Sequence, residues 1–250
     1  MRVPVRPGIE VLLVLGVSLG RSAVYAMLDM ADLLTRGAPL ASQTSSLNPT
    51  LIADRPWLDA LYQIAGTVFP VVPALLAVYL VSLTSTHPWQ ALGLELGRHT
   101  RTDLLGGLGL AALIGIPGLG LYLAARAAGL NTQVEASGLG AGAWAVIILG
   151  ARAAMNGFLE EVVVVGYLFD RLPRLGWTPL AVLACSALLR GSYHLYQGWG
   201  GFAGNIVMGL VFGAVYLRFR RVMPLVVAHT AIDVAAFVGY AALAPRVGWL

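Results

Sequence analysis

The sequence predicts an all-α protein, a polytopic transmembrane helix bundle of about seven spans with its functional site among the last four. Of the 250 residues, 58% are hydrophobic and only 11% are charged. Soluble domains carry about 25% charged residues. The apolar residues also fall into long runs separated by short polar segments, which is typical of helices that cross a bilayer. We therefore expect a multi-pass membrane protein with little mass outside the lipid.

Seven apolar runs are long enough to be spans. They cover about residues 9–30, 58–83, 103–125, 143–169, 178–196, 202–217 and 222–243. Glu10 opens the first run and the apolar pattern continues to Leu34, so we expect this span to be retained and not removed as a signal peptide. Pro70 and Pro73 predict a kink in the second span.

Polar residues and glycines distinguish the segment after the second span and two of the later spans. Residues 84–102 are too polar to cross a bilayer, and we expect them to lie at its interface. The third span is rich in glycine and contains Pro117, which predicts tight packing or a local break. Gly209 and Gly213 in the sixth span form a GxxxG pattern, which allows close helix approach.

The positive charge predicts the orientation in the membrane. The net charge of +4 comes from arginine alone, since the chain contains no lysine. With the N-terminus inside, the inner segments carry Arg2, Arg6, Arg98, Arg101, Arg171, Arg174, Arg218, Arg220 and Arg221, and the outer segments carry Arg36, Arg55, Arg126 and Arg246. This excess predicts an N-terminus inside the cell and a C-terminus outside. A basic complement made only of arginine is typical of a GC-rich bacterial genome, so we expect a bacterial plasma membrane. We expect the lipid bilayer as a partner and no nucleic acid.

Two adjacent carboxylates, Glu160 and Glu161, stand inside an apolar run. An acidic side chain at membrane depth costs roughly 2.5 kcal/mol or more and usually faces a cavity or a partner. Neighbours on a helix point about 100° apart, so we expect one glutamate to face a cavity and the other to pair elsewhere.

Polar residues four positions apart form one stripe on each of three of the last four spans. The stripes are Arg152, Asn156 and Glu160; Arg190 and His194; and His229 and Asp233. We expect Arg152 to be a structural partner of one of the two glutamates.

Two histidines with carboxylates suit two chemistries. Glu160, His194, His229 and Asp233 are candidate ligands of a divalent metal such as zinc, with a position left for water. Alternatively, a glutamate acts as general base on water without a metal, and the histidines stabilise the oxyanion. The single cysteine, Cys185, excludes an intrachain disulfide and a cysteine-rich metal site.

Residues 143–241 resemble the CAAX protease and bacteriocin-processing (CPBP, or Abi) family of intramembrane endopeptidases. That family carries EExxxR on one helix, FxxxH on the next, and HxxxN or HxxxD on a later one. The residues that match, in the same order and spacing, are Glu160, Glu161, His194, His229 and Asp233. The resemblance divides the chain into N-terminal transmembrane helices with an interfacial segment, residues 1–142, and a catalytic helical core, residues 143–250.

The chain departs from the family pattern at two positions. Val165 stands where the first motif has arginine, and Arg190 stands where the second has phenylalanine. We expect the two changes to compensate each other, because a guanidinium on the neighbouring helix can still neutralise Glu161.

The resemblance implies hydrolysis of a peptide bond within the membrane. Glu160 would activate water, Glu161, His194, His229 and Asp233 would complete the site, and Arg190, Arg152 and Asn156 would support it. The expected cofactor is a divalent metal, zinc, and the expected substrate is a membrane protein or a lipidated peptide. Two alternatives are a catalytically inactive relative that acts as a membrane binding or immunity protein, and a proton- or ion-coupled transporter.

Overall fold

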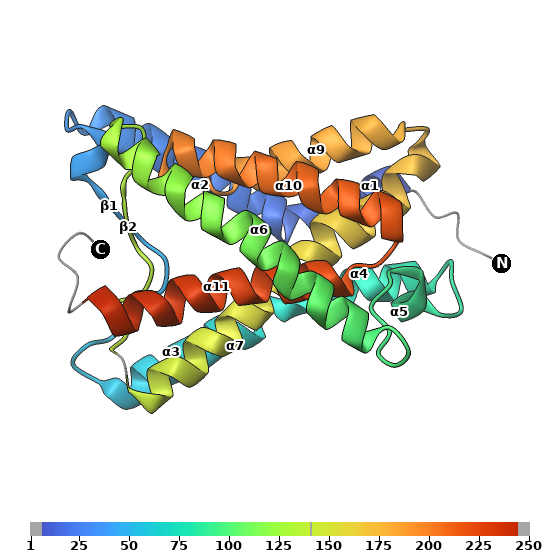
Figure 1. The fold of residues 1–250 in the computed structure, drawn as a ribbon, viewed down its shortest axis with the longest axis horizontal. Coiled ribbons are helices and arrows are strands. Elements are labelled where there is room, and N and C mark those ends of the chain that lie inside the picture. Colours follow the sequence, from blue (N-terminus) through green and yellow to red (C-terminus); the bar gives the residue numbers. More distant parts are fainter. Residues whose placement is uncertain (1–6, 141, 245–250) are drawn as a thin grey trace.

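The computed structural model describes residues 7–140 and 142–244, and within them the chain is almost entirely helical (Figure 1). The first half contains α1 (Pro7–Gly16), α2 (Leu19–Thr35), η1 (Leu40–Ser42), β1 (Thr44–Ser46), α3 (Pro56–Val68), α4 (Val71–Ser82), α5 (Pro88–Ala91), α6 (Thr100–Ala127) and β2 (Gln133–Glu135). The second half contains α7 (Ala143–Glu160), η2 (Glu161–Tyr167), α8 (Leu168–Arg171), η3 (Leu172–Leu175), α9 (Pro179–Ser192), η4 (Leu195–Gln197), α10 (Trp199–Phe219) and α11 (Met223–Leu243). The predicted helix bundle is confirmed.

Among the described residues, four helical stretches are long and apolar enough to cross a membrane. They are Pro56–Ser82, Thr100–Ala127, Trp199–Phe219 and Met223–Leu243. The pair Pro7–Gly16 and Leu19–Thr35, bent by 50°, makes a fifth if it forms one broken span. The other two predicted spans, 143–169 and 178–196, also fold as helices, but charged residues interrupt the first and the helix of the second has 14 residues.

Proline has different effects in two of these stretches. α3 ends at Val68 and α4 begins at Val71, so the predicted kink falls at Pro70. α6, in contrast, continues through Pro117 without a break. Most of its glycines have open space where a side chain would be, but Gly107 lies against Val227 of α11. Of the glycines in α6, only Gly107 is therefore needed for close packing against another helix.

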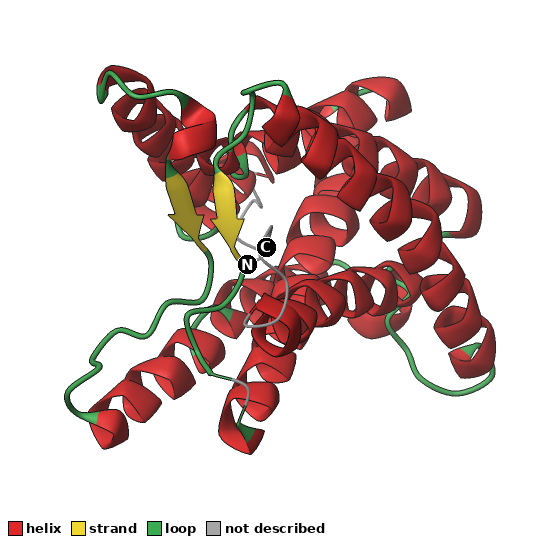
Figure 2. Ribbon diagram, turned by 60° about the vertical axis from the view of Figure 1, so that its left-hand side comes forward, coloured by secondary structure: helices red, strands yellow, loops and turns green. Residues whose placement is uncertain are grey.

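Two short parallel strands, β1 and β2, are the feature that hydrophobic patterning does not reveal (Figure 2). β1 lies in the connection from η1 to α3 and β2 in the connection from α6 to α7, so the sheet pairs these two connections. Ser45 Oγ donates to the carbonyl of Tyr196 at 2.7 Å, and the Thr132 amide donates to the carbonyl of Gln197 at 3.1 Å. These bonds tie the sheet to the segment that directly follows His194.

Close helix pairs form the core around the polar residues. A Cβ on Gly209 of α10 would lie 2.8 Å from the Cα of Ala187 in α9, and one on Gly213 would lie 2.4 Å from Leu183 Cδ1. The GxxxG pattern thus permits the close approach that the sequence predicts. On the other side, a Cβ on Gly157 of α7 would lie 2.7 Å from Thr230 Oγ1 of α11. Gly209 and Gly213 therefore let α10 approach α9, and Gly157 lets α11 approach α7 close to its glutamates.

A partly buried arginine, Arg221, ties the turn between α10 and α11 to the segment around the start of α6. Arg221 donates through Nε to Asp103 Oδ1 at 2.8 Å and also pairs with Glu95. The hydrogen bond that Arg221 donates to Asp103 raises the pKa of Arg221, so the guanidinium stays charged. Three of the arginines used for the orientation, Arg2, Arg6 and Arg246, lie outside the described residues.

Candidate active site

The α-helix of α7 widens into a π-helix at the two glutamates. Glu160 is the last residue of α7 and Glu161 is the first of η2. π-Turns inside helices are rare and frequent at functional sites. The two glutamates differ in exposure, as expected, with Glu160 at 11% and Glu161 at 0%, but the expectation that the second one pairs elsewhere is wrong, because both carboxylates contact Arg190. The widened turn and the long side chains reduce the separation that an ideal α-helix would impose.

Arg190 holds both carboxylates from the neighbouring helix. Its Nη2 lies 2.8 Å from each carboxylate oxygen of Glu161, and its Nη1 lies 3.3 Å from Glu160 Oε2. The guanidinium is fully buried and its Cζ lies 5.6 Å from the ring centroid of Phe212. Val165 lies in the apolar core. The predicted contact between Arg190 and Glu161 is therefore present.

His229 reaches the same carboxylates from α11. Its Nδ1 lies 2.7 Å from Glu161 Oε1. Because a carboxylate oxygen accepts, Nδ1–H is the donor of this hydrogen bond. Its Nε2 lies 3.9 Å from Glu160 Oε2 and 3.7 Å from Asp233 Oδ1, beyond direct hydrogen-bond distance from both. Asn156 Nδ2 donates to Asp233 Oδ2 at 3.0 Å. The free nitrogen of His229 thus lies between two carboxylates.

The end of α9 adds an aromatic hydroxyl that the sequence reasoning missed. Tyr193 Oη donates to Glu160 Oε2 at 2.7 Å. Tyr193 follows Arg190 by three positions, and residues three apart share a helix face. That spacing was the signal by which Tyr193 could have been found. His194 comes next, and its Nδ1 lies 3.0 Å from the carbonyl of Arg190, which fixes the ring.

Arg152 is not a partner of either glutamate, and the prediction that it supports them is wrong. Its Nη1 donates to Asn48 Oδ1 at 3.1 Å. The eight residues that separate Arg152 from Glu160 correspond to about 12 Å along a helix. Arg152 therefore reaches the loop before α3, whereas Asn156, one turn closer, reaches the site.

The arrangement of the acidic and histidine side chains tests whether the site can hold the expected metal ion. Among the described residues, the ligand atoms of Glu160, Glu161 and His229 lie within 4.8 Å of one another, and His194 and Asp233 fall outside this group. Both oxygens of Glu161 already accept from Arg190. A divalent cation among these three residues would lie against a buried guanidinium, and like charges repel strongly away from water. The group therefore fits a metal ion poorly.

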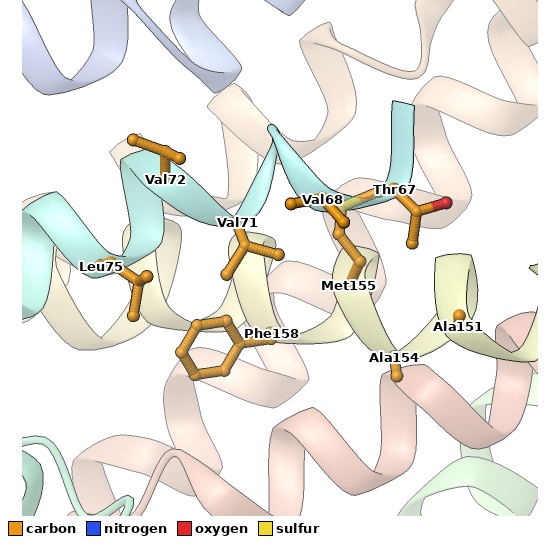
Figure 3. A pocket seen from close by; sticks show the side chains of 9 residues that line it. All are labelled: Thr67, Val68, Val71, Val72, Leu75, Ala151, Ala154, Met155 and Phe158. Atoms are coloured by element: carbon orange, nitrogen blue, oxygen red, sulfur yellow. The ribbon is translucent and has the colours of Figure 1, made fainter. Parts of the chain in front are cut away.

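An apolar groove of about 470 Å³ lies elsewhere, between the bend of α3 and α4 and the side of α7 (Figure 3). It is lined by Thr67, Val68, Val71, Val72, Leu75, Ala151, Ala154, Met155 and Phe158. The α7 residues in this set follow the 3-and-4 spacing of one helix face. Asn156 and Glu160 are not in the lining, so the groove is not the site of the acidic residues.

Comparison with known proteins identifies the segment that contains the site. Residues 142–235 match the family model described as type II CAAX prenyl endopeptidase Rce1-like. No curated protein and no solved structure matches the chain. The matched segment includes the glutamates, Arg190, both histidines and Asp233. Over residues 142–235 this membrane protein thus carries an Rce1-like domain, which confirms its resemblance to the CPBP family.

Proposed function

We propose that this protein is an intramembrane endopeptidase in which Glu160 activates the hydrolytic water. The observation that carries the proposal is the unequal environment of the two Glu160 oxygens. Oε2 is held by Tyr193 and Arg190, whereas Oε1 accepts no hydrogen bond from the described residues. The Glu160 side chain is 11% exposed, and its Oε1 atom is not fully buried. A water molecule can therefore reach Oε1. A carboxylate oxygen that is accessible and unoccupied is what a general base requires.

Each step of the hydrolysis then has a candidate group. Glu160 Oε1 accepts a proton from water as the water oxygen attacks the carbonyl carbon of the substrate. When the His229 ring is protonated, its Nε2–H donates to the oxyanion of the tetrahedral intermediate, while Nδ1–H remains on Glu161. Glu160 returns the proton to the leaving nitrogen as the C–N bond breaks. Asp233 Oδ1 lies 3.7 Å from His229 Nε2, and we assign Asp233 and His194 to the remaining contacts with water and the intermediate.

The charges around the base are balanced by residues of the chain. Arg190 neutralises Glu161 and shares Glu160, so the pair can remain ionised away from water. No step needs a metal ion. The zinc site predicted from the sequence stays a prediction, and removal of metal tests it.

The substrate follows from the family description. The matched family consists of prenyl endopeptidases of the CAAX type. We therefore propose a peptide with a lipidated cysteine near its C-terminus, held in the bilayer by its lipid chain. An unmodified membrane protein is the alternative substrate.

The test is cleavage by the purified protein in detergent. The probes are a quenched fluorescent peptide that ends in a farnesylated CAAX sequence and the same peptide without the farnesyl group. Wild type should cleave the farnesylated peptide, and Glu160→Gln should reduce kcat by at least about a hundredfold, the lower end of general-base contributions. Glutamine keeps the size and accepts from Tyr193, so the variant should stay folded. No cleavage of either peptide by folded wild type would favour the binding-protein alternative.

A further inference from the structure

Tyr193 stands beside the proposed base and belongs to none of the recognised motif positions. Its side chain is 5% exposed, and its hydroxyl donates to Glu160 Oε2 at 2.7 Å. We infer that Tyr193 is a positioning residue, which holds Glu160 so that Oε1 and not Oε2 receives the proton of water. This inference rests on the proposed function of Glu160 as general base.

The distances around Glu160 Oε2 indicate that Tyr193 makes the strongest hydrogen bond to the Glu160 carboxylate. The bond from Tyr193 has the short length of a charge-assisted O–H···O⁻ contact. Arg190 Nη1 lies 3.3 Å away, and the same guanidinium makes its two 2.8 Å bonds to Glu161. His229 Nε2 lies 3.9 Å from Oε2, too far for a hydrogen bond. Loss of the tyrosine hydroxyl would therefore leave the Glu160 carboxylate held only by the longer contact to Arg190.

The backbone of α9 explains why the hydroxyl arrives at this point. The Tyr193 amide donates to the carbonyl of Leu189 at 3.2 Å, which extends the helical hydrogen bonding by one residue beyond Ser192. Arg190 and Tyr193 then project from the same face toward Glu160. His194 is fixed by the carbonyl of Arg190 at 3.0 Å. One turn of α9 thus supplies the counter-charge, the positioning hydroxyl and a site histidine.

The segment also offers a matched control. Tyr196, three residues later, accepts a hydrogen bond from its neighbour Gln197 at 3.0 Å, and within residues 7–140 and 142–244 its hydroxyl bonds no acidic side chain. Tyr193→Phe and Tyr196→Phe each remove one hydroxyl from the same stretch of chain, a buried one at Tyr193 and a partly buried one at Tyr196. Only the first removes a bond to Glu160.

The experiment compares the two variants with wild type on the farnesylated peptide. Tyr193→Phe should lower kcat by about tenfold to a hundredfold, the effect of losing a hydrogen bond to a charged group in the transition state. KM should stay within about twofold, because Tyr193 acts through Glu160 and not on the ground-state substrate. Tyr196→Phe should retain the kcat of wild type, and both variants should keep its melting temperature.

An infrared measurement provides a readout that a purely structural role would not change. The carboxylate band of Glu160 is isolated as the difference between wild type and Glu160→Gln, and the same difference is recorded in the Tyr193→Phe and Tyr196→Phe backgrounds. The band should shift with Tyr193→Phe and remain in place with Tyr196→Phe. An unshifted band, a kcat within about twofold of wild type, or a rise in KM alone would overturn the inference. If the wild-type protein does not cleave the peptide, both the proposed function and the role of Tyr193 are wrong. If wild type cleaves and Tyr193→Phe has the same kcat, only the role of Tyr193 is wrong.

Discussion

Arg190 and Glu161 form a two-bond ion pair across two helices, with Nη2 of the arginine 2.8 Å from both carboxylate oxygens. Both side chains are fully buried. Two charges in such a place are tolerated only as a pair, because each alone would lose its hydration without compensation. The pair therefore couples the position of α9 to that of η2, and with it the position of everything that α9 carries.

Replacing Arg190 by phenylalanine, the family residue at this position, should destabilise the protein and abolish cleavage. The change leaves Glu161 buried without its counter-charge, which costs about 3–5 kcal/mol when one partner of a buried pair is removed. The loss should appear as a lower melting temperature in detergent together with loss of kcat.

Two further variants control this prediction. Arg174→Ala removes an arginine whose side chain is 42% exposed, and its stability should match wild type. In the double variant Val165→Arg, Arg190→Phe the arginine returns to the helix of Glu161, and part of the lost stability should be recovered. A stable and active single Arg190→Phe variant would show that the exchange of positions has no compensating role.

Gly157→Ala should push α11 away from α7 and lower both stability and kcat. The added methyl group would lie 2.7 Å from Thr230 Oγ1 and 3.0 Å from the carbonyl of Val226, one turn from His229. Overpacking of this kind costs about 1–3 kcal/mol. Gly150→Ala on the same helix is the control, because its methyl group meets nothing within 4 Å and alanine favours a helix. Equal behaviour of the two variants in thermal melts and cleavage assays would contradict this view of the contact.

Asp233→Asn should retain most activity, whereas Asp233→Ala should lose it. Asparagine keeps the size of the side chain and an oxygen that can accept from Asn156, which donates to Asp233 at 3.0 Å. Its amide can also donate to an oxyanion near His229. We expect kcat of the asparagine variant within about tenfold of wild type, and a loss of about a hundredfold or more for alanine. An asparagine variant as inactive as the alanine variant would mean that the negative charge itself is required.

Chelation should leave cleavage unchanged. The carboxylates that would bind a metal ion already accept from Arg190 and Tyr193, so the chain itself supplies the positive charge and the orientation. The measurement is kcat after dialysis against a chelator, with elemental analysis of the purified protein. Loss of activity that zinc alone restores would establish the zinc site that the sequence predicts.

Local sequence patterns determined the helices and the identity of the acidic and histidine residues. Polar residues four apart must share a helix face, which is why Asn156 belongs with Glu160 and why His229 belongs with Asp233. The kink at Pro70 follows from the missing amide hydrogen and the fixed backbone angle of proline. The two strands could not be predicted in this way, since three-residue segments carry no readable periodicity.

The tertiary structure decided which of these residues meet, and at what distance. Spacing along a helix identifies a face but not the neighbouring element that the face contacts, so the sequence places Arg152 with the glutamates although its side chain reaches Asn48. The widening of α7 into η2 depends on packing, and it brings two adjacent carboxylates onto one arginine. The sequence by itself determined the charged and polar groups that must be neutralised inside an apolar bundle. Only the packing of α9 and α11 against α7 decided that Arg190, Tyr193 and His229 neutralise and orient them, because contacts between helices depend on side chains far apart in the chain.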